Sequence, residues 1–157
     1  MNKSKIFKLI VSLDLPLGLG AIAGLFTANA VPAWYATLNR PSFNPPSWVF
    51  GPVWTTLYLL MGFSLFLIWI QSPDKKRNTA IFVFFLQQTL NFAWSFLFFY
   101  FNMIGLALIE IILLWICILI MIVLFYRIKP LAAYINIPYL LWVTFASVLN
   151  ASYYFLN

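Results

Sequence analysis

The chain has 157 residues, of which 64% are hydrophobic, 20% are aromatic and only 8% are charged. Soluble domains carry about 25% charged residues, so this composition excludes a soluble globular protein and predicts a single-domain integral membrane protein. The formal net charge of +6 comes from basic residues scattered between apolar runs, which excludes the basic groove of a nucleic-acid-binding protein.

Five apolar stretches are long enough to cross a bilayer, which takes about 20 residues. The sequence therefore predicts an all-α bundle of five transmembrane helices, with a proline- and aromatic-rich loop after the first. We expect helices at residues 6–30, 48–70, 79–101, 104–127 and 131–156, a lid loop at 31–47 and a charged loop at 74–77.

The first predicted helix contains a G-x-x-x-G pattern at Gly20 and Gly24. Such small residues let another helix approach closely, either inside the same bundle or across a dimer. Ala28-Asn29-Ala30 also fits a signal-peptide cleavage site. The apolar stretch is longer than the about 7–15 residues of a signal peptide, so we expect it to be retained.

The predicted lid loop is rich in proline, which removes backbone donors and forces extended or turn geometry. Its backbone must stay irregular while it carries several rings, unlike an ordinary hydrophilic loop. The prolines are Pro41, Pro45, Pro46 and Pro52, and the aromatic residues are Trp34, Tyr35, Phe43, Trp48 and Phe50. We expect this loop to close a ligand cavity between the membrane helices.

Two predicted helices align aromatic, apolar and small residues along one face, at the spacing of helical turns. In the second helix these are Trp54, Tyr58, Met61 and Leu65. In the fifth they are Tyr139, Trp142, Ala146, Leu149 or Asn150, and Tyr153. Rings, small residues and an amide on one face suit a flat apolar ligand with a few polar edges.

Polar side chains inside the membrane must face protein or a cavity, because hydrocarbon offers them no partner. The third predicted helix carries Gln87, Gln88, Asn91 and Ser95 beside Trp94. Interhelical hydrogen bonding and cavity lining explain these residues equally well. We expect Glu110 in the fourth helix to be protonated or hydrogen-bonded, as a structural contact or as a functional ionisable group.

The sequence contains no histidine and a single cysteine, Cys117. Histidine is the commonest transition-metal ligand and the commonest general base. The three acidic residues are dispersed, and no nucleophile stands beside a base. We therefore expect no metal site, no required cofactor and no hydrolytic or acid–base catalysis.

Five crossings place the N-terminus and the second and fourth loops on one side of the membrane. That side holds Lys3, Lys5, Lys8, Lys75, Lys76, Arg77, Arg127 and Lys129, and only Arg40 lies opposite. The positive-inside rule then predicts a multi-pass cell-membrane protein with a cytoplasmic N-terminus. The first loop and the C-terminus are expected on the extracytoplasmic side.

Four stretches stand out by their motifs: WYATLNRPSFNPPSWVFGPVWTTLYLLMG, QQTLNFAWSFLFF, IEIILLW and PYLLWVTFASVLN. In order and spacing they resemble the translocator protein family, which includes bacterial tryptophan-rich sensory proteins and mitochondrial peripheral-type benzodiazepine receptors. The resemblance implies a five-helix bundle, usually a homodimer in the lipid membrane. It also implies a pocket under the first loop for porphyrins, in particular protoporphyrin IX, and for drug-like aromatic ligands.

Carried over position by position, the resemblance implies a pocket made by Tyr35, Pro45, Phe50, Trp54, Tyr58, Asn91, Trp94, Trp142, Ala146 and Leu149. We add Glu110, the intramembrane acid, and Arg40, the only cation on the outer side, which could bind a propionate by a charge-assisted bond. The resemblance also links Trp54 and Trp142 to light-dependent porphyrin breakdown, in which they would be the catalytic residues.

Three functions follow as hypotheses. The first is a porphyrin-binding membrane receptor or sensor, and the second is an enzyme that oxidises bound porphyrin under light. The third is a transporter of tetrapyrroles or sterols, but the family's sterol motif needs a basic residue near the end of the fifth helix, and none follows Lys129. Without histidine to ligate iron, we expect metal-free porphyrin to bind better than haem.

Overall fold

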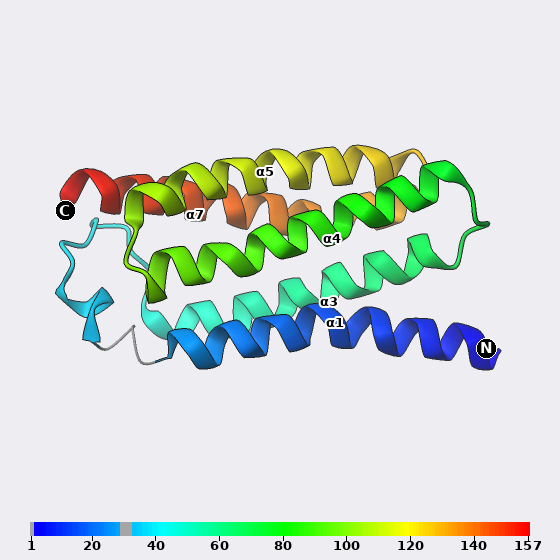
Figure 1. The fold of residues 1–157 in the computed structure, drawn as a ribbon, viewed down its shortest axis with the longest axis horizontal. Coiled ribbons are helices and arrows are strands. Elements are labelled where there is room, and N and C mark those ends of the chain that lie inside the picture. The colour runs from blue at the N-terminus through cyan, green and yellow to red at the C-terminus, as the bar shows by residue number, and fades with distance from the viewer. Residues whose placement is uncertain (1, 29–32) are drawn as a thin grey trace.

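The computed structural model describes residues 2–28 and 33–157. Five long helices lie side by side along the molecule (Figure 1). They are α1 (Lys3–Thr27), α3 (Phe50–Trp69), α4 (Lys75–Ser95), α5 (Ile104–Tyr126) and α7 (Ile137–Leu156), with a short α6 (Pro130–Tyr134) before the last. In the described part of the chain, five helical segments are long and apolar enough to cross a membrane. The predicted all-α bundle of five transmembrane helices is therefore confirmed.

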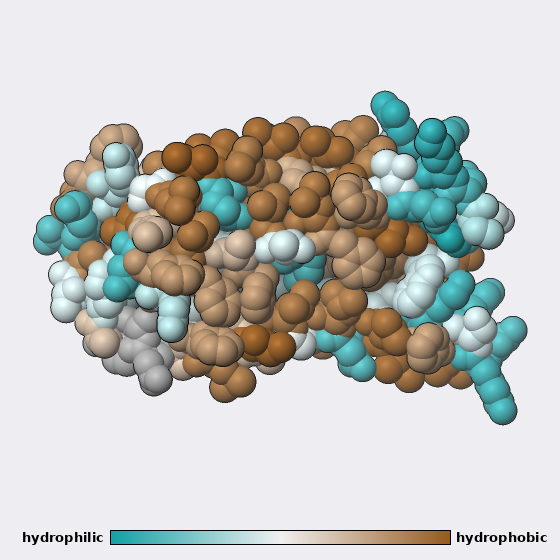
Figure 2. Space-filling view, viewed as in Figure 1, coloured by the Kyte–Doolittle hydropathy of each residue, from teal (hydrophilic) through white to brown (hydrophobic). Residues whose placement is uncertain are grey.

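The two ends of the bundle differ in chemistry. The N-terminus and the connections α3–α4 and α5–α6 lie at one end, and the residues before α3 and the C-terminus lie at the other (Figure 1). Hydrophilic residues gather at the N-terminal end, and apolar residues cover the middle of the visible face (Figure 2). This apolar belt is what a bilayer-spanning bundle requires.

Close contact between α1 and α3 depends on Gly62. A Cβ added at Gly62 would lie 2.5 Å from the carbonyl oxygen of Ser12 and 2.8 Å from Cα of Leu13. Pro16 lies inside α1, and it has no N–H to donate to that same Ser12 carbonyl. Glycine therefore lets the backbone of α3 approach α1 at the turn that the proline has opened.

The core is packed solidly toward the N-terminal end of the bundle. Met61, Ile68, Phe84, Met121 and Phe125 are all 0% exposed there. The Phe84 and Phe125 rings stack with their centroids 6.4 Å apart, which joins α4 to α5. The half of the bundle near the C-terminus is packed less solidly, because it contains the cavity described below.

The prediction of a loop at 74–77 is wrong beyond its first residue. Helix α4 begins at Lys75, because the Asp74 side chain accepts a hydrogen bond of 2.7 Å from the backbone N–H of Arg77. This is an N-cap, which satisfies one of the free donors of the first turn. Helix α1 likewise begins early, at Lys3, and the predicted helix end at 29–30 and loop start at 31–32 lie outside the described residues.

The fifth transmembrane segment is not one continuous helix. Helix α6 ends at Tyr134 and α7 begins at Ile137, so the helical segment expected over 131–156 is interrupted at residues 135–136, although residues 130–156 still form one candidate membrane span. Pro138 lacks the N–H that a continuous helix would donate to the Tyr134 carbonyl. The Asn136 side chain donates to the Ala132 carbonyl at 2.8 Å, which satisfies one of the carbonyls left at the end of α6.

Candidate functional site

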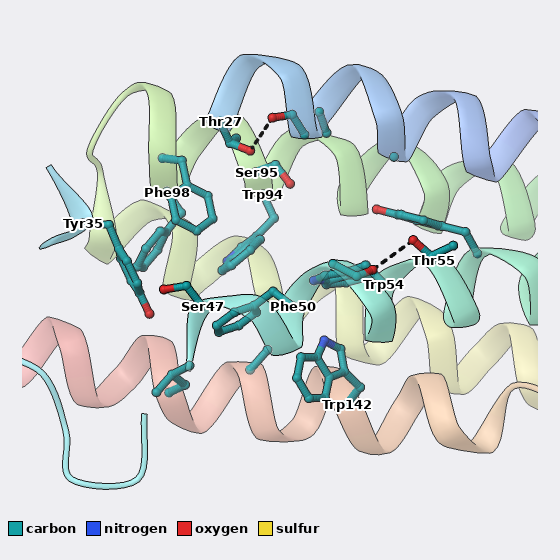
Figure 3. Close-up of a pocket in the computed structure, with 18 of the residues that line it drawn as sticks. Thr27, Tyr35, Ser47, Phe50, Trp54, Thr55, Trp94, Ser95, Phe98 and Trp142 are labelled. Carbon is teal, nitrogen blue, oxygen red and sulfur yellow. Dashed lines mark hydrogen bonds between the residues drawn. The ribbon is translucent and has the colours of Figure 1, made fainter. Parts of the chain in front are cut away.

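A cavity of about 550 Å³ lies inside the bundle, in the half that contains the residues before α3 (Figure 3). Small-molecule pockets in proteins have volumes of about 300–1,000 Å³. Nine of the twenty-two residues in its wall are aromatic, about twice the 20% of the whole chain. We call this space the aromatic cavity.

Helix α3 turns one aromatic face toward the cavity. Phe50, Trp54 and Tyr58 follow one another at intervals of four residues, so they project from the same side of the helix. The Trp54 and Tyr58 rings stack at 5.5 Å, and Phe50 meets Trp142 of α7 edge-on at 6.0 Å. Smaller residues complete this wall: Ser47, from the 3-10 turn η2 (Ser47–Val49), Gly51 and Thr55.

Helix α7 contributes a second wall, made by Trp142, Ala146, Leu149, Asn150 and Tyr153. Among the described residues, Trp142 Nε1 has no hydrogen-bond partner. Buried polar groups are nearly always paired, and an indole N–H can only donate. A molecule bound in the cavity could satisfy Trp142 by presenting an acceptor.

The end of α4 widens into a π-helix, η3 (Phe96–Tyr100). Ser95, Phe98 and Phe99 lie in the cavity wall beside Trp94, and the Trp94 and Phe98 rings stack at 5.2 Å. Trp94 Nε1 donates to Asn150 Oδ1 at 3.0 Å, which joins α4 to α7 at the cavity. Local π-helices occur frequently at functional sites.

The residues before α3 close one end of the cavity through Tyr35, in the 3-10 turn η1 (Tyr35–Thr37). Tyr35 is 4% exposed, and its ring lies 5.2 Å from that of Tyr153. Its hydroxyl donates to Asn44 Oδ1 at 2.9 Å, and burial raises the pKa of this hydroxyl. Tyr35 therefore anchors the loop to the bundle by packing on Tyr153. Its hydrogen bond to Asn44 joins two parts of the loop to each other.

Not all rings of the loop face the cavity. Trp48 is 75% exposed, and Phe43 contacts Phe145 of α7 from outside the cavity wall, with 6.4 Å between the ring centroids. The loop is also tied to the end of α7, because the Asn39 N–H donates to Asn157 Oδ1 at 2.8 Å. The loop thus lies over the cavity mainly through Tyr35.

Helix α1 supplies a wall of small residues. They are Gly20, Ala21, Ala23 and Gly24, with Leu17 and Thr27 at either end. A Cβ added at Gly20 would lie 2.1 Å from the Tyr58 ring, so Gly20 serves packing inside the bundle. Among the described residues nothing lies within 4 Å of a Cβ added at Gly24.

A chain of buried hydrogen bonds runs from the cavity wall into the core. The Tyr58 hydroxyl donates to Asn91 Oδ1 at 3.0 Å, and Asn91 Nδ2 donates to the Tyr139 hydroxyl at 3.1 Å. The Tyr139 hydroxyl donates in turn to Gln87 Oε1 at 2.9 Å. Of the two explanations for the polar groups of α4, interhelical bonding holds for Asn91 and Gln87, whereas Ser95 lines the cavity.

Comparison with known proteins agrees with this architecture. The sequence matches the TspO/MBR family over residues 12–156. This chain belongs to the TspO/MBR family. It is 40% identical to the tryptophan-rich protein TspO of Archaeoglobus fulgidus over 97% of this chain and 98% of that protein. It is 38% identical to the tryptophan-rich protein TspO of Chlorobaculum tepidum over 100% of this chain and 99% of that protein. It is 39% identical to the human translocator protein over 74% of this chain and 70% of that protein.

Family membership and the five apolar helices make this chain a multi-pass membrane protein. Eight of the residues expected in the pocket lie together in the wall of the aromatic cavity: Tyr35, Phe50, Trp54, Tyr58, Trp94, Trp142, Ala146 and Leu149. Four others lie outside that wall: Arg40, Pro45, Asn91 and Glu110. The wall residues of α1 and Phe98 and Phe99 were missed, although the G-x-x-x-G pattern and the aromatic run after Trp94 were visible signals.

Three of the four outlying residues touch the wall indirectly. Asn91 accepts the hydrogen bond of Tyr58, and the Arg40 guanidinium carbon lies 5.9 Å from the centre of the Tyr35 ring. The carbonyl of Pro45 accepts a hydrogen bond of 3.2 Å from the side chain of Asn44, which also binds Tyr35. These residues therefore support the wall from behind.

Glu110 is buried in α5, with 7% of its surface exposed. Neither carboxyl oxygen has a hydrogen-bond partner among the described residues. The expected alternative of a satisfied hydrogen bond is therefore not seen. An unpaired carboxylate inside a bundle is very costly, so the neutral acid fits this environment. In the described part of the chain, no group of three His, Cys, Asp or Glu residues could hold a metal ion.

Proposed function

We propose that this protein is a membrane receptor or sensor that binds a porphyrin, with protoporphyrin IX as the model ligand, in the aromatic cavity. The observation that carries the proposal is the cavity itself, with a volume of about 550 Å³ and indole, phenol and phenyl rings from α3, α4, α7 and the loop. A flat aromatic macrocycle can stack on such rings, each pair contributing about 0.5–1.5 kcal/mol beyond burial. Drug-like aromatic ligands should occupy the same space.

Polar groups near the cavity fit the edges of such a ligand. Trp142 Nε1 lacks a partner among the described residues, and a porphyrin carries acceptors in its propionates. Arg40 lies against Tyr35, at the end of the cavity closed by the loop. A propionate that reached past Tyr35 would meet the guanidinium and form a charge-assisted hydrogen bond.

The residues of the wall favour the metal-free porphyrin over haem. Haem iron is commonly held by histidine, a cysteine thiolate or methionine. The chain has no histidine, and Met61 and Cys117 are buried outside the described cavity wall. Haem would therefore gain no imidazole, thiolate or thioether ligand here.

The test is a titration in detergent or nanodiscs, followed by quenching of intrinsic tryptophan fluorescence. Protoporphyrin IX should bind the wild-type protein, and Ala146→Leu should weaken it by filling the wall beside Trp142. Val148→Leu is the matched control, because Val148 is on the same helix but 53% exposed outside the cavity. Equal affinities for the two variants, or a haem affinity about tenfold above that of the free base, would contradict the proposal.

A second candidate is the light-dependent breakdown of bound porphyrin. Trp54 and Trp142 are both part of the cavity wall (Figure 3), so each indole would lie beside a bound macrocycle. Under light the macrocycle would be oxidised and dissolved oxygen would be reduced. The indoles would donate electrons or hydrogen atoms to the oxygen species and regain them from the macrocycle. Trp54→Phe combined with Trp142→Phe should then abolish bleaching while affinity is retained. Unchanged bleaching in the double variant, or bleaching at the same rate in detergent alone, excludes this activity.

We also propose that the N-terminal end of the bundle is cytoplasmic. Eight of the nine basic residues belong to the N-terminus and to the connections at that end, and Arg40 belongs to the opposite end. The positive-inside rule favours this orientation. The loop before α3 and the C-terminus are then extracytoplasmic, and a membrane-impermeant reagent on intact cells should label a cysteine at Ser42 but not one at Asn78.

A further inference from the structure

The aromatic cavity is open on one side only within the described part of the chain. Its wall residues on α4, η3 and α7 are all buried or half-buried. The exposed wall residues come from α1, from the turn η2 and from the start of α3: Ala21, Gly24, Ser47, Gly51 and Thr55. The opening of the cavity therefore lies along the seam between these two helices.

Contacts along the seam define how α1 and α3 pair. The Lys8 ammonium donates to the Trp69 carbonyl at 3.3 Å, and a Cβ at Gly20 would collide with the Tyr58 ring. This antiparallel register places Ala21 opposite Thr55 and Gly24 opposite Gly51. A Cβ added at either of these two glycines has nothing within 4 Å among the described residues, so the space beside both glycines is open.

The opening lies at the depth of the lipid chains. Ala21 is thirteen residues beyond Lys8, which is about 20 Å along a helix that rises 1.5 Å per residue. Lys8 is at the basic end of the bundle, where its ammonium also lies 5.7 Å from the centre of the Trp69 ring. The hydrocarbon layer is about 30 Å thick, so the opening faces lipid tails and not water.

Two hydroxyl groups beside the opening are bonded within their own helices. The hydroxyl of Thr55 donates to the Gly51 carbonyl at 2.9 Å and that of Thr27 to the Gly24 carbonyl at 3.3 Å (Figure 3). Neither hydroxyl therefore presents a free donor to an arriving molecule. Tyr153, which is 1% exposed, lies deeper in the wall.

Building on the proposed function, we infer that the cavity takes its ligand from the membrane through this opening between α1 and α3. The ligand class is then a bilayer-dissolved aromatic molecule that has a hydrogen-bond acceptor. Its apolar edge passes the small residues Ala21, Gly24, Gly51 and Thr55, and its acceptor faces the wall that contains Trp142. The loop before α3 can stay closed during this exchange, because the route does not pass Tyr35.

The test is to narrow the opening at its rim. Gly24→Leu and Gly51→Leu each place a side chain in the opening, where a Cβ meets no neighbour among the described residues. Gly18→Leu is the matched control, since Gly18 is equally free of neighbours and lies outside the described cavity wall. Each protein is reconstituted in lipid vesicles, and stopped-flow tryptophan quenching follows protoporphyrin IX binding from the lipid phase and its release to acceptor vesicles.

Both rim variants should slow association by about tenfold, whereas Gly18→Leu should leave the association rate unchanged. The wild-type association rate should follow the porphyrin-to-lipid ratio and not the aqueous concentration. An unchanged association rate in both rim variants, or an effect carried by faster release alone, would overturn the inference. A wild-type protein that shows no equilibrium quenching would instead refute the proposed function.

Discussion

We expect Gly20→Ala to destabilise the bundle and weaken ligand binding, although alanine normally stabilises a helix. A Cβ at Gly20 would lie 2.1, 2.6 and 2.8 Å from three atoms of the Tyr58 ring. Ordinary van der Waals contact begins at 3.4 Å, so the methyl group and the ring must move apart by about 1.3 Å.

Tyr58 cannot retreat freely from such a methyl group. Its hydroxyl donates to Asn91 at 3.0 Å and its ring stacks on Trp54 at 5.5 Å. Overpacking costs about 1–3 kcal/mol, and a lost interhelical hydrogen bond in a membrane protein costs about 0.6 kcal/mol. The higher helix propensity of alanine stabilises the helix by about 1 kcal/mol relative to glycine. The net loss in free energy of unfolding is then about 0.6–2.6 kcal/mol.

The matched control is Gly18→Ala, on the same helix, where an added Cβ meets nothing within 4 Å among the described residues. This variant keeps the gain in helix propensity, about 1 kcal/mol, without the clash. Unfolding in mixed micelles with increasing dodecyl sulfate, followed by circular dichroism, measures both variants. Titration with protoporphyrin IX should show weaker binding for Gly20→Ala only.

A double-mutant cycle with Tyr58→Leu checks the cause of the effect. If the ring is what the methyl group meets, Gly20→Ala should cost less in the Tyr58→Leu background than in the wild type. Equal free energies of unfolding for Gly20→Ala and Gly18→Ala would refute the reasoning, as would strict additivity in the cycle.

Two further predictions concern the hydrogen bonds around the cavity. Asn91→Leu removes the bonds to Tyr58 and Tyr139 and should cost about 1–3 kcal/mol in the same unfolding assay; Thr89→Leu, at an exposed position of the same helix, should cost far less, and equal losses would contradict the role of the network. Because burial raises the pKa of the Tyr35 hydroxyl, the fold favours its protonated form. Its stabilisation is complete below about pH 10 and is lost as the pH rises toward the higher folded value. Tryptophan fluorescence should therefore report loop opening only above about pH 10, and an identical alkaline transition in Tyr35→Phe would contradict this assignment.

Much of the aromatic wall could be predicted from spacing alone. Trp54 and Tyr58, and likewise Trp142 and Ala146, are four residues apart, and a helix necessarily presents such pairs on one face. The indole and phenol groups of these pairs each carry a polar atom. Lipid tails offer that atom no hydrogen-bond partner, so a face toward the bundle interior suits these rings better. The periodicity therefore identified the faces that meet in the cavity.

Two features of helix geometry escaped the sequence reasoning for local reasons. The basic residues after Asp74 indicated a loop, but a helix can continue past the hydrocarbon layer into water when an N-cap begins it. The π-helix at Phe96–Tyr100 has no reliable residue signature, so the positions of Phe98 and Phe99 could not be derived. Both features depend on hydrogen bonds that composition does not reveal.

Glu110 shows a third limit. Its position inside an apolar helix marked it as a buried acid that needs a partner or a proton. Whether it reached the ligand cavity depended on which neighbour its face of α5 meets. The structure places it outside the cavity wall and without a hydrogen-bond partner among the described residues.

By itself the sequence determined that the chain spans a membrane five times and which end of the bundle is basic. These properties are sums over local segments, since insertion depends on the transfer free energy of about 20 consecutive side chains. Only the tertiary structure decided that α1 packs against α3 at Gly20 and Tyr58, and that the space beside Gly24 and Gly51 is open among the described residues. A cavity and its opening are distances between helices far apart in the chain, and such distances depend on how all the side chains pack at once.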